Sequence, residues 1–503
     1  MNTVGTDKRG GGRRRRRWTP APLAAVTATV LAGSVAIPAG TAMAAVASPA
    51  ITAAATTRSS LADHLEHRVT GAKVFQHLRA LQRIADANGG VRATDTPGYT
   101  ASANYVATRL RRAGYQVTRQ QVPYTDAAFD AETARETSPS TQDINVLMMR
   151  FSPSGPAGGI TADVVAPPTE RDGVLIADPG CTPESYDGLD AAGKIVVVPR
   201  AACGFDVQQE VAASLGAVAF VTYLVTPSPD NIWRLFVFEP DRFHIPSATV
   251  SQSQGEALAA AASHGPVRLA LDLRAHLIHR TTENIIAETT GGRADHVVMA
   301  GAHLDSVSEG PGIDDNASSA AALLEIAEDI APMQSKLVNK VRFAFWGAEE
   351  LVDVGSGFYV EQLSQQERGA IAYYLNSELI AAPNFATFVV HVPGGSAADQ
   401  RVENEYAGYF TRRGLPFERQ DNVVVGSDDE AFSAVGIPIG GVNGAQFSAK
   451  SPAEAAVFGG TAGQLFDHCY HQACDRLDDL NATALDRHAR ATAWVVGDLA
   501  VHG

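Results

Sequence analysis

The chain has 503 residues, 45% of them hydrophobic, and carries a formal net charge of −15. This length is sufficient for two domains of ordinary size and a processed end segment. The acidic balance argues against a nucleic acid partner, because binding to phosphates depends on clustered Lys and Arg side chains.

The first 44 residues have the pattern of a secretory signal peptide. Residues 13–17 are consecutive arginines, residues 21–40 form an apolar stretch, and Ala42-Met43-Ala44 is a small-residue cleavage site. A retained membrane anchor is the alternative, but Pro38 interrupts the stretch and bulky apolar residues are scarce in it. We therefore expect a secreted, extracellular protein whose mature form is not held in a membrane.

The next segment changes character twice. Residues 45–60 are rich in Ala, Thr and Ser and show no periodicity, which is typical of a linker or pro-segment. From residue 61 to residue 125 the pattern is that of an α/β domain. Helices are expected around residues 74–85 and over 99–113, followed by a strand over 115–122.

Residues 126–281 form a β-rich segment with many Pro and Gly residues. The pattern predicts strands over 193–198, 217–222 and 243–250. It also predicts one helix over 206–215, with Gly216 as the residue just past its end. Nothing in the segment has catalytic spacing, so His244 and His279 are expected to be structural or surface residues.

Residues 282–503 return to the α/β pattern. Short apolar strands are expected over 296–300, 340–345 and 370–375, with helices such as 318–330 between them and a final helix over 482–501. This alternation predicts a mostly parallel sheet with helices on both faces. Residues 61–125 and 282–503 are therefore expected to form one domain, interrupted by an insert over 126–281 at a loop tip.

Several potential metal ligands follow these predicted strands or begin a helix. In parallel sheets, residues after the carboxyl ends of the strands meet at one edge. Histidine and carboxylate donors suit Zn²⁺, and a bridging carboxylate can hold two ions ~3.5–4 Å apart. One zinc ion needs only three protein ligands, so five candidates suggest two ions. The candidates are His303, Asp315, Glu350, Glu378 and the later His471.

Glu349 is adjacent to Glu350 and is expected to act differently. In an extended backbone, neighbouring side chains point to opposite sides, so only one of the two can bind the metal. The other would face the attacking water as a general base, and Glu349 suits this role. Taken singly, these residues also have ordinary interpretations: Asp315 as a helix N-cap, and the two glutamates as a solvated pair.

The four cysteines form an even number in a chain expected to reach an oxidising space. Neighbourhood in sequence suggests the pairs Cys181–Cys203 and Cys469–Cys474, out of three possible connectivities. A zinc–thiolate cluster is the alternative, but the chain has no Cys-x2-Cys spacing to favour it.

Part of the insert resembles a protease-associated domain, an accessory module of secreted and vacuolar peptidases. The resemblance lies in Gly180-Cys181, residues 193–198 (GKIVVV), Cys203-Gly204-Phe205, Gly216-Ala217 and residues 245–248 (IPSA). It implies a role in substrate access or protein contact.

The rest of the chain resembles the secreted di-zinc aminopeptidases of metallopeptidase family 28. The motifs are residues 301–307 (GAHLDSV), 310–316 (GPGIDDN), 345–351 (FWGAEEL), 374–380 (YLNSELI) and 459–475 (GGTAGQLFDHCYHQACD). The resemblance implies the zinc exopeptidase fold, a three-layer α/β sandwich. It also implies activity on the N-termini of peptides or proteins. We expect the protein to be a monomer.

The same resemblance implies a role for each site residue. His303 and Glu378 would bind one zinc ion, Glu350 and His471 the second, and Asp315 would bridge the two. Glu349 would be the general base, and Asp305 would support a ligand histidine by a hydrogen bond. Tyr470 would stabilise the oxyanion, and the Cys469–Cys474 bridge would clamp the loop that carries Tyr470 and His471.

The chain departs from the family pattern at three places. Glu378 stands where the family has Asp, which is one methylene shorter. Gly426 and Asp429 stand where relatives have Arg and His, so a group that grips the substrate is missing. Asp486 remains from a calcium site of the relatives, but Arg490 replaces its partner, and no calcium is assigned.

Two other functions remain as alternatives. A glutaminyl-cyclase-like acyltransferase shares the fold, but it binds one zinc ion and the five-ligand set argues against it. A non-catalytic binding protein on a degenerate peptidase scaffold is suggested by the changes at Glu378 and Gly426. The presence of Glu349, Tyr470 and His471 argues against that alternative.

Overall fold

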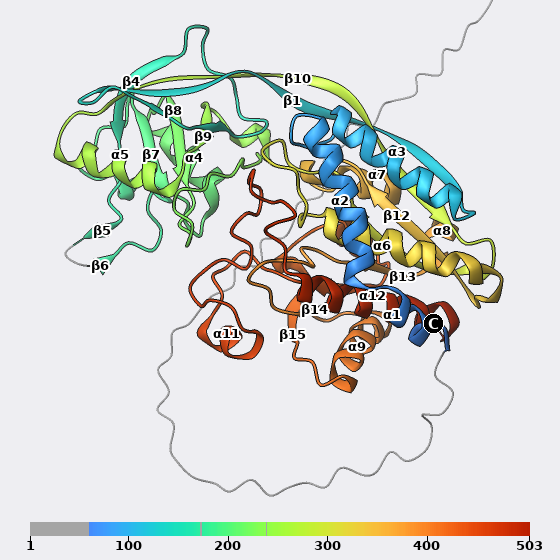
Figure 1. The fold of residues 1–503 in the computed structure, drawn as a ribbon. Helices are drawn as coiled ribbons and strands as arrows, with labels where there is room; N and C mark the ends of the chain where they lie inside the picture. The colour runs from blue at the N-terminus through green and yellow to red at the C-terminus, as the bar shows by residue number, and fades with distance from the viewer. Residues whose placement is uncertain (1–59, 172–173, 238, 503) are drawn as a thin grey trace, which may run out of the picture. The chain divides into compact units, whose positions relative to one another are not determined.

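The computed structural model describes residues 60–171, 174–237 and 239–502 (Figure 1). The predicted signal peptide over 1–44 lies outside these residues, as does the predicted linker over 45–60 except for Ser60, which begins helix α1. Over the described part of the chain, we find no helix that is both long enough and apolar enough to cross a membrane.

A mixed sheet forms the centre of the α/β region. Its strands lie in the order β15-β14-β16-β13-β11-β12-β10, and β1 pairs with β10. The β12-β11-β13-β16 neighbours are parallel, whereas β10 is antiparallel to β12 and β14 is antiparallel to β16. The bounds are β1 (Gln116–Ser138), β10 (Arg268–Glu288), β11 (Arg293–His303), β12 (Asn339–Trp346), β13 (Ile371–Asn376), β14 (Phe388–His391), β15 (Glu418–Asp421) and β16 (Ile439–Asn443).

Alternate residues of the central strands pack against helices on opposite faces of this sheet. On β11, Val298 and Ala300 belong to one hydrophobic cluster and Val297 and Met299 to another. The first cluster is built with α1 (Ser60–Arg68), α2 (Gly71–Ala87), α3 (Pro97–Arg112), α6 (Ala317–Ile330), α9 (Ala397–Arg412) and α12 (Ala482–His502). The second is built with α7 (Val354–Gln362) and α10 (Asp429–Ser433). These three layers confirm the predicted fold class.

Shorter elements complete the α/β region. The remaining α-helices are α8 (Gln365–Ala370) and α11 (Pro452–Phe458). The 3-10 helices are η3 (Ala331–Lys336), η4 (Glu349–Leu351) and η5 (Asn422–Val424).

The insert continues the sheet beyond β10. Strand β4 pairs antiparallel with β10. The next neighbours are parallel to one another and follow in the order β4-β7-β8-β9. Strand β3 lies at the edge, antiparallel to β9. The bounds are β2 (Gln142–Ile144), β3 (Leu147–Met148), β4 (Ile160–Val165), β5 (Glu170–Arg171), β6 (Val174–Leu175), β7 (Ile195–Pro199), β8 (Ala219–Tyr223), β9 (Ser247–Thr249), η1 (Pro183–Tyr186) and η2 (Pro240–Arg242).

In the described part of the insert, two α-helices cover the sheet, not the single one that the sequence predicted. Helix α4 (Gly204–Ser214) ends before Gly216, whose φ of 84° matches the predicted position just past the helix. Helix α5 (Gln252–His264) was missed. Only Gly255 and Leu258 of α5 are buried, so its sequence lacks the apolar stripe by which a helix is recognised.

Strand β1 is longer than predicted and runs beside β10, a strand that was not predicted (Figure 1). Their pairing extends from Gln116 opposite Glu288 to Ser138 opposite Arg268. The strand predicted over 115–122 therefore continues through the position at which the insert was expected to begin. Its second half, TDAAFDAETARETS, contains few large apolar residues to indicate a strand.

Candidate active site

The predicted site residues lie where the central strands end. His303 is the last residue of β11, and Glu349 and Glu350 form a 3-10 turn shortly after β12. Glu378 follows the end of β13, and Asp315 precedes the start of α6. The parallel β12-β11-β13 order brings these carboxyl ends together at one edge of the sheet.

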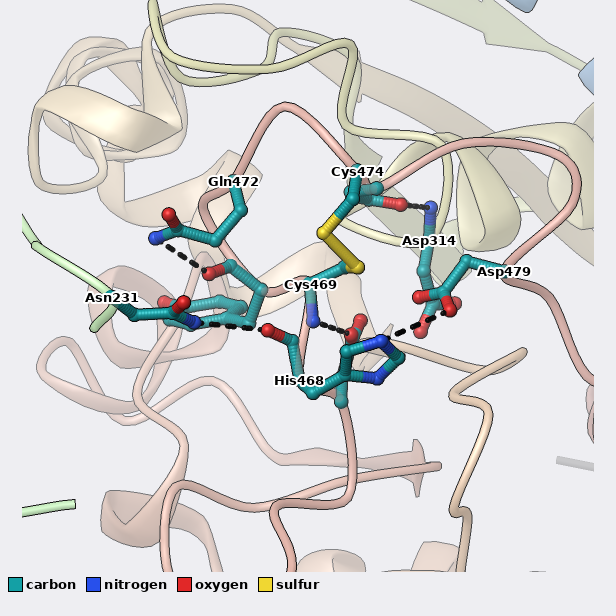
Figure 2. The surroundings of a disulfide bond; sticks show 10 residues. Asn231, Asp314, His468, Cys469, Gln472, Cys474 and Asp479 are labelled. Carbon is teal, nitrogen blue, oxygen red and sulfur yellow. Dashed lines mark hydrogen bonds and ion pairs between the residues drawn. A yellow bond between two sulfur atoms is a disulfide. The ribbon is translucent and has the colours of Figure 1, made fainter. Parts of the chain in front are cut away.

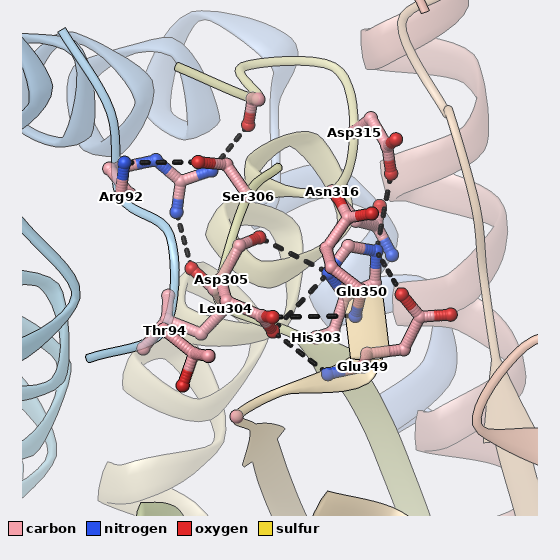
Figure 3. Close-up of polar contacts among 12 residues, drawn as sticks. Arg92, Thr94, His303, Leu304, Asp305, Ser306, Asp315, Asn316, Glu349 and Glu350 are labelled. Carbon is pink, nitrogen blue, oxygen red and sulfur yellow. Dashed lines mark hydrogen bonds and ion pairs between the residues drawn. The ribbon is translucent and has the colours of Figure 1, made fainter. Parts of the chain in front are cut away.

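Asp315 lies between two sets of possible ligands. One of its oxygens, Oδ1, is 3.2 Å from Nε2 of His303, and that nitrogen is 3.6 Å from Oε2 of Glu378. The other oxygen, Oδ2, is 3.1 Å from Nε2 of His471, which is also 3.1 Å from Oε2 of Glu350. Figure 3 shows His303, Asp315 and Glu350 converging from separate segments of the chain.

The donor set fits a metal site. His303, Asp315 and Glu350 each offer one atom within 4.8 Å of the others. Oε1 of Glu350 is buried without a hydrogen-bond partner. Such burial is energetically costly unless a cation binds the oxygen. Among the described residues, no Lys or Arg side chain forms an ion pair with Asp315, Glu349, Glu350 or Glu378. Imidazole nitrogen and carboxylate oxygen together suit Zn²⁺.

Many acidic side chains lie close together in the buried site, and the pKa values of the site residues are shifted as a result. Burial raises the pKa of Glu350 to about 7, although His471 opposes the shift. Burial also raises the pKa of Asp315, but hydrogen bonds and charge from His303 and His471 outweigh it, so the pKa falls below its ordinary value. Burial lowers the pKa of His471, whereas Glu350 and Asp315 raise it, with a net rise to about 10.

The side chains of Glu349 and Glu350 point to different partners, as expected, but not for the expected reason. The assumption of an extended backbone is wrong, because both residues lie in η4, between Ala348 (φ 61°) and Val352 (φ 69°). Glu350 faces His471, whereas Oε2 of Glu349 lies 3.5 Å from Nε2 of His303. Burial and nearby carboxylates, Asp353 among them, raise the pKa of Glu349 well above its ordinary value, although His303 opposes the shift.

Asp305 connects the two glutamates to His303. Its carboxylate accepts the backbone N–H groups of Glu349 at 3.2 Å and Glu350 at 3.4 Å. Nδ1 of His303 donates to the main-chain oxygen of Asp305 at 3.2 Å, and the carboxylate lies 3.7 Å from the same nitrogen. Asp305 is thus positioned to orient His303, and it also fixes the turn that carries Glu349 and Glu350 (Figure 3).

The longer side chain of Glu378 is held by neighbours. Ser427 donates its hydroxyl to Oε1 at 2.6 Å, and the side-chain amide of Asn376 donates to the same oxygen at 3.2 Å. Oε2 remains directed at His303. The replacement of Asp by Glu therefore does not prevent this carboxylate from reaching the site.

His471 lies in sequence between Cys469 and Cys474, whose disulfide closes a small loop (Figure 2). The structure contains the two predicted pairs, Cys469–Cys474 and Cys181–Cys203. The ring of Tyr470 stacks on His471 within this loop. Burial and the carboxylates, led by Asp315 and Glu350, raise the pKa of Tyr470 well above its ordinary value, so its hydroxyl remains protonated at neutral pH.

The insert contacts this loop and the loop after β11. Asn231 donates its side-chain amide to the main-chain oxygen of His468 at 3.0 Å, and Gln472 donates to that of Ile232 at 3.2 Å. Arg234 of the insert lies 3.3 Å from Glu309. A cavity of about 340 Å³ adjoins these contacts, and its walls include Phe129, Arg150, Arg234, Phe236, Asp305, Glu309, Glu350 and His471.

The other departures from the family pattern can be located as well. Asp429 is buried next to Gly426, and both line a cavity of about 10 Å³ beside Glu378. The carboxylate of Asp486 accepts from Arg490 Nε at 2.7 Å and from the backbone N–H of Gly71 at 2.7 Å. Asp486 is thus engaged by protein donors.

Three residues that hold side chains or loops of the site in place were not predicted from the sequence. Asn376 and Ser427 orient Glu378, and Arg92 lies fully buried behind the loop after β11. Single polar residues next to loops usually lie at the surface, and the partners of Ser427 and Arg92 are far away in sequence. No local pattern distinguishes these residues.

A mixed sheet covered by helices, with histidines and carboxylates gathered at the ends of its strands, is the architecture of a metallohydrolase. The chain matches Peptidase family M28 over residues 284–496 and the PA domain over residues 160–258. It is similar to the probable lipoprotein aminopeptidase LpqL of Mycobacterium tuberculosis, with 36% identity over 86% of this chain and 85% of that protein. Leucine aminopeptidase 2 of Trichophyton tonsurans is 31% identical, over 87% of this chain and 86% of that protein.

Solved structures share the fold. The zinc aminopeptidase BSAP from Bacillus subtilis superposes with a TM-score of 0.67 at 20% identity, covering 86% of this chain and 96% of that one. The aminopeptidase from Aneurinibacillus sp. strain AM-1 gives 0.64 at 22% identity, covering 88% and 97%. The chain belongs to peptidase family M28, carries a protease-associated insert, and is a peptide hydrolase.

Proposed function

We propose that this protein is a secreted aminopeptidase that removes N-terminal residues from peptides with the help of two zinc ions. The observation that carries the proposal is the position of Asp315, whose two oxygens face different histidines, each accompanied by a second carboxylate. One bridging carboxylate between two such sets is the arrangement that a pair of ions requires. The relatives described above as aminopeptidases support the choice of substrate.

The residues divide into two ligand sets and a catalytic pair. His303 and Glu378 would hold one ion, Glu350 and His471 the other, and Asp315 both. When bound, the ions would polarise the scissile carbonyl and lower the pKa of the attacking water. Glu349 accepts the proton from that water and transfers it to the leaving amine. Tyr470 donates a hydrogen bond to the oxygen that becomes negative in the transition state.

Secretion is part of the proposal. It is supported by the signal-like pattern of residues 13–44 and by two disulfides, which persist in oxidising compartments.

Metal analysis of the mature protein, together with hydrolysis of aminoacyl anilides, tests the proposed function. We expect close to two zinc ions per chain, loss of hydrolysis with a chelator, and recovery when zinc is restored. Full activity at a saturating stoichiometry of one ion would contradict the two-ion site. Equal cleavage of free and N-acetylated leucine anilides would contradict an aminopeptidase. Cyclisation of N-terminal Gln without hydrolysis would favour the acyltransferase alternative.

A further inference from the structure

Arg92 is a buried cation with an unusual set of partners. Its side chain is 0% exposed, and it forms no ion pair with any residue in the described part of the chain. Nε donates to the main-chain oxygen of Pro311 at 2.8 Å, and the two terminal nitrogens donate to those of Leu304 and Gly312. The backbone N–H of Arg92 donates to the hydroxyl of Ser306 at 3.0 Å. Buried arginines are ordinarily paired with acids. A buried guanidinium that donates instead to three main-chain carbonyls needs an explanation.

The three carbonyls lie at the two ends of one loop. Leu304 directly follows His303, and Pro311 and Gly312 come shortly before Asp315. This loop has no regular secondary structure, so its buried carbonyls need donors from elsewhere. The planar fork of the guanidinium supplies them in a fixed geometry. Arg92 therefore fixes the distance between the segments that carry the two proposed ligands.

The loop is packed closely around the guanidinium. Gly312 has a φ of 60°, and a Cβ atom there would come within 2.3 Å of the main-chain oxygen of Asp315 and 3.2 Å of Nη2 of Arg92. The first contact is closer than atoms can approach without displacing the loop, and the second is tight. A side chain at this position would therefore disturb the segment before Asp315, against which Arg92 packs.

The charge of Arg92 faces the acids of the site. Burial lowers its pKa to about 10, and the carboxylates of Asp475, Asp305, Asp315 and Glu350 oppose the shift, so it stays charged at neutral pH. Asp475 in turn accepts the backbone N–H groups of Asp314 at 2.6 Å and Asp315 at 3.1 Å.

We propose that Arg92 is a positioning residue of the metal centre, which holds His303 and Asp315 at ligand spacing. It touches neither substrate nor metal. The inference depends on the proposed function, because it assumes that these residues bind zinc.

The test compares Arg92→Met and Arg92→Lys with the wild type in the complete secreted chain. Zinc affinity is measured by competition with a chelator, and coordination geometry by the visible spectrum of the Co²⁺-substituted protein. We expect Arg92→Met to bind zinc on the order of 10–100-fold more weakly, as for other residues that orient metal ligands. Arg92→Lys keeps the charge but not the planar fork, so we expect partial rescue and an altered cobalt spectrum.

A matched control is Arg342→Met, which removes another largely buried arginine, paired with Glu288 and Tyr359. We expect it to lower stability without changing zinc affinity. Wild-type zinc affinity and cobalt spectrum in a folded Arg92→Met protein would overturn the inference. If that variant does not fold, Arg92→Lys decides by the same two measurements. Failure of the wild-type protein to bind zinc would instead overturn the proposed function.

Discussion

The aromatic ring of Tyr470 lies flat against the imidazole of His471, with ring centroids 3.8 Å apart and planes inclined by 21°. His471 has a φ of 58°, which turns the chain within the disulfide loop. The stacking couples the proposed oxyanion donor to a proposed metal ligand. A displacement of either ring would disturb the other.

Tyr470→Phe separates these two roles, because Phe keeps the stacking and loses only the hydroxyl. We expect zinc content and KM to remain near wild type, and kcat to fall by a factor on the order of 10²–10³, the usual effect of removing one oxyanion donor. Steady-state kinetics on leucine anilide and metal analysis measure the two effects. A kcat within twofold of wild type would mean that Tyr470 is not the donor.

Glu349→Ala tests the division of labour between the adjacent glutamates. Glu349 faces His303 without belonging to either proposed ligand set, so the variant should retain both zinc ions. Its kcat should fall by a factor on the order of 10²–10⁴, the usual contribution of a positioned base. The matched control, Glu350→Ala, should lose zinc as well as activity. If Glu349→Ala loses zinc and Glu350→Ala does not, the two roles are exchanged.

Arg234→Met tests whether the insert shapes the substrate site. Arg234 is paired with Glu132 and Glu309 and forms a wall of the cavity next to Glu350 and His471. If peptide residues after the scissile bond occupy this cavity, kcat/KM should fall roughly tenfold, or about 1.4 kcal/mol, for a pentapeptide. The value for leucine anilide, whose leaving group is short, should change less.

Arg242→Met is the control for this experiment, because Arg242 forms its ion pairs with Asp206, Glu210 and Glu239 within the insert and does not line the cavity. It should leave both substrates unaffected. An equal loss on both substrates in Arg234→Met would indicate a general disturbance of the site and exclude a role in peptide binding.

Asp429→His tests the side-chain preference for the N-terminal residue. Burial and nearby acids, led by Asp353 and Glu430, raise the pKa of Asp429 well above its ordinary value, and no Lys or Arg in the described residues pairs with it. A cationic or small N-terminal side chain should suit these surroundings. In Asp429→His we expect the Leu-to-Lys ratio of kcat/KM to rise by roughly tenfold, about 1.4 kcal/mol.

The comparison uses anilides of Leu, Ala and Lys, with Asp421→His as control because Asp421 is an exposed carboxylate. An unchanged Leu-to-Lys ratio in Asp429→His would refute the role of this residue but leave the proposed activity intact.

The parts of the site that could be predicted are those encoded by local patterns. His303 and Glu378 follow short apolar strands, and the order of parallel strands then brings them together. The backbone at Glu349 and Glu350 could not be predicted, since the turn begins at a positive φ of Ala348 and both residues donate their N–H groups to Asp305, which lies in a different loop. The role of Arg92 could not be predicted either, because its hydrogen-bond partners lie 212–220 residues away in the sequence.

The fold shows the same division. Central strands such as β11 were located from continuous apolar runs, because both faces of the sheet are covered. The second half of β1 was missed, because it contains few large apolar residues and pairs with the first half of β10. Strand β10 was not predicted either, although Leu269, Leu271 and Leu273 alternate along it and are buried.

The long pairing of β1 with β10 also affects how such a chain can change during evolution. Tyr124 and Arg280 are direct partners in the ladder, and 155 residues separate them in the sequence. Partners in an antiparallel ladder have Cα atoms about 4.5–5.5 Å apart, a distance that a two-residue turn can close. A single deletion between them would leave a simple hairpin at the border of an otherwise unchanged sheet. The additional module can thus be gained or lost in one genetic event, without rerouting any strand that leads to the catalytic edge.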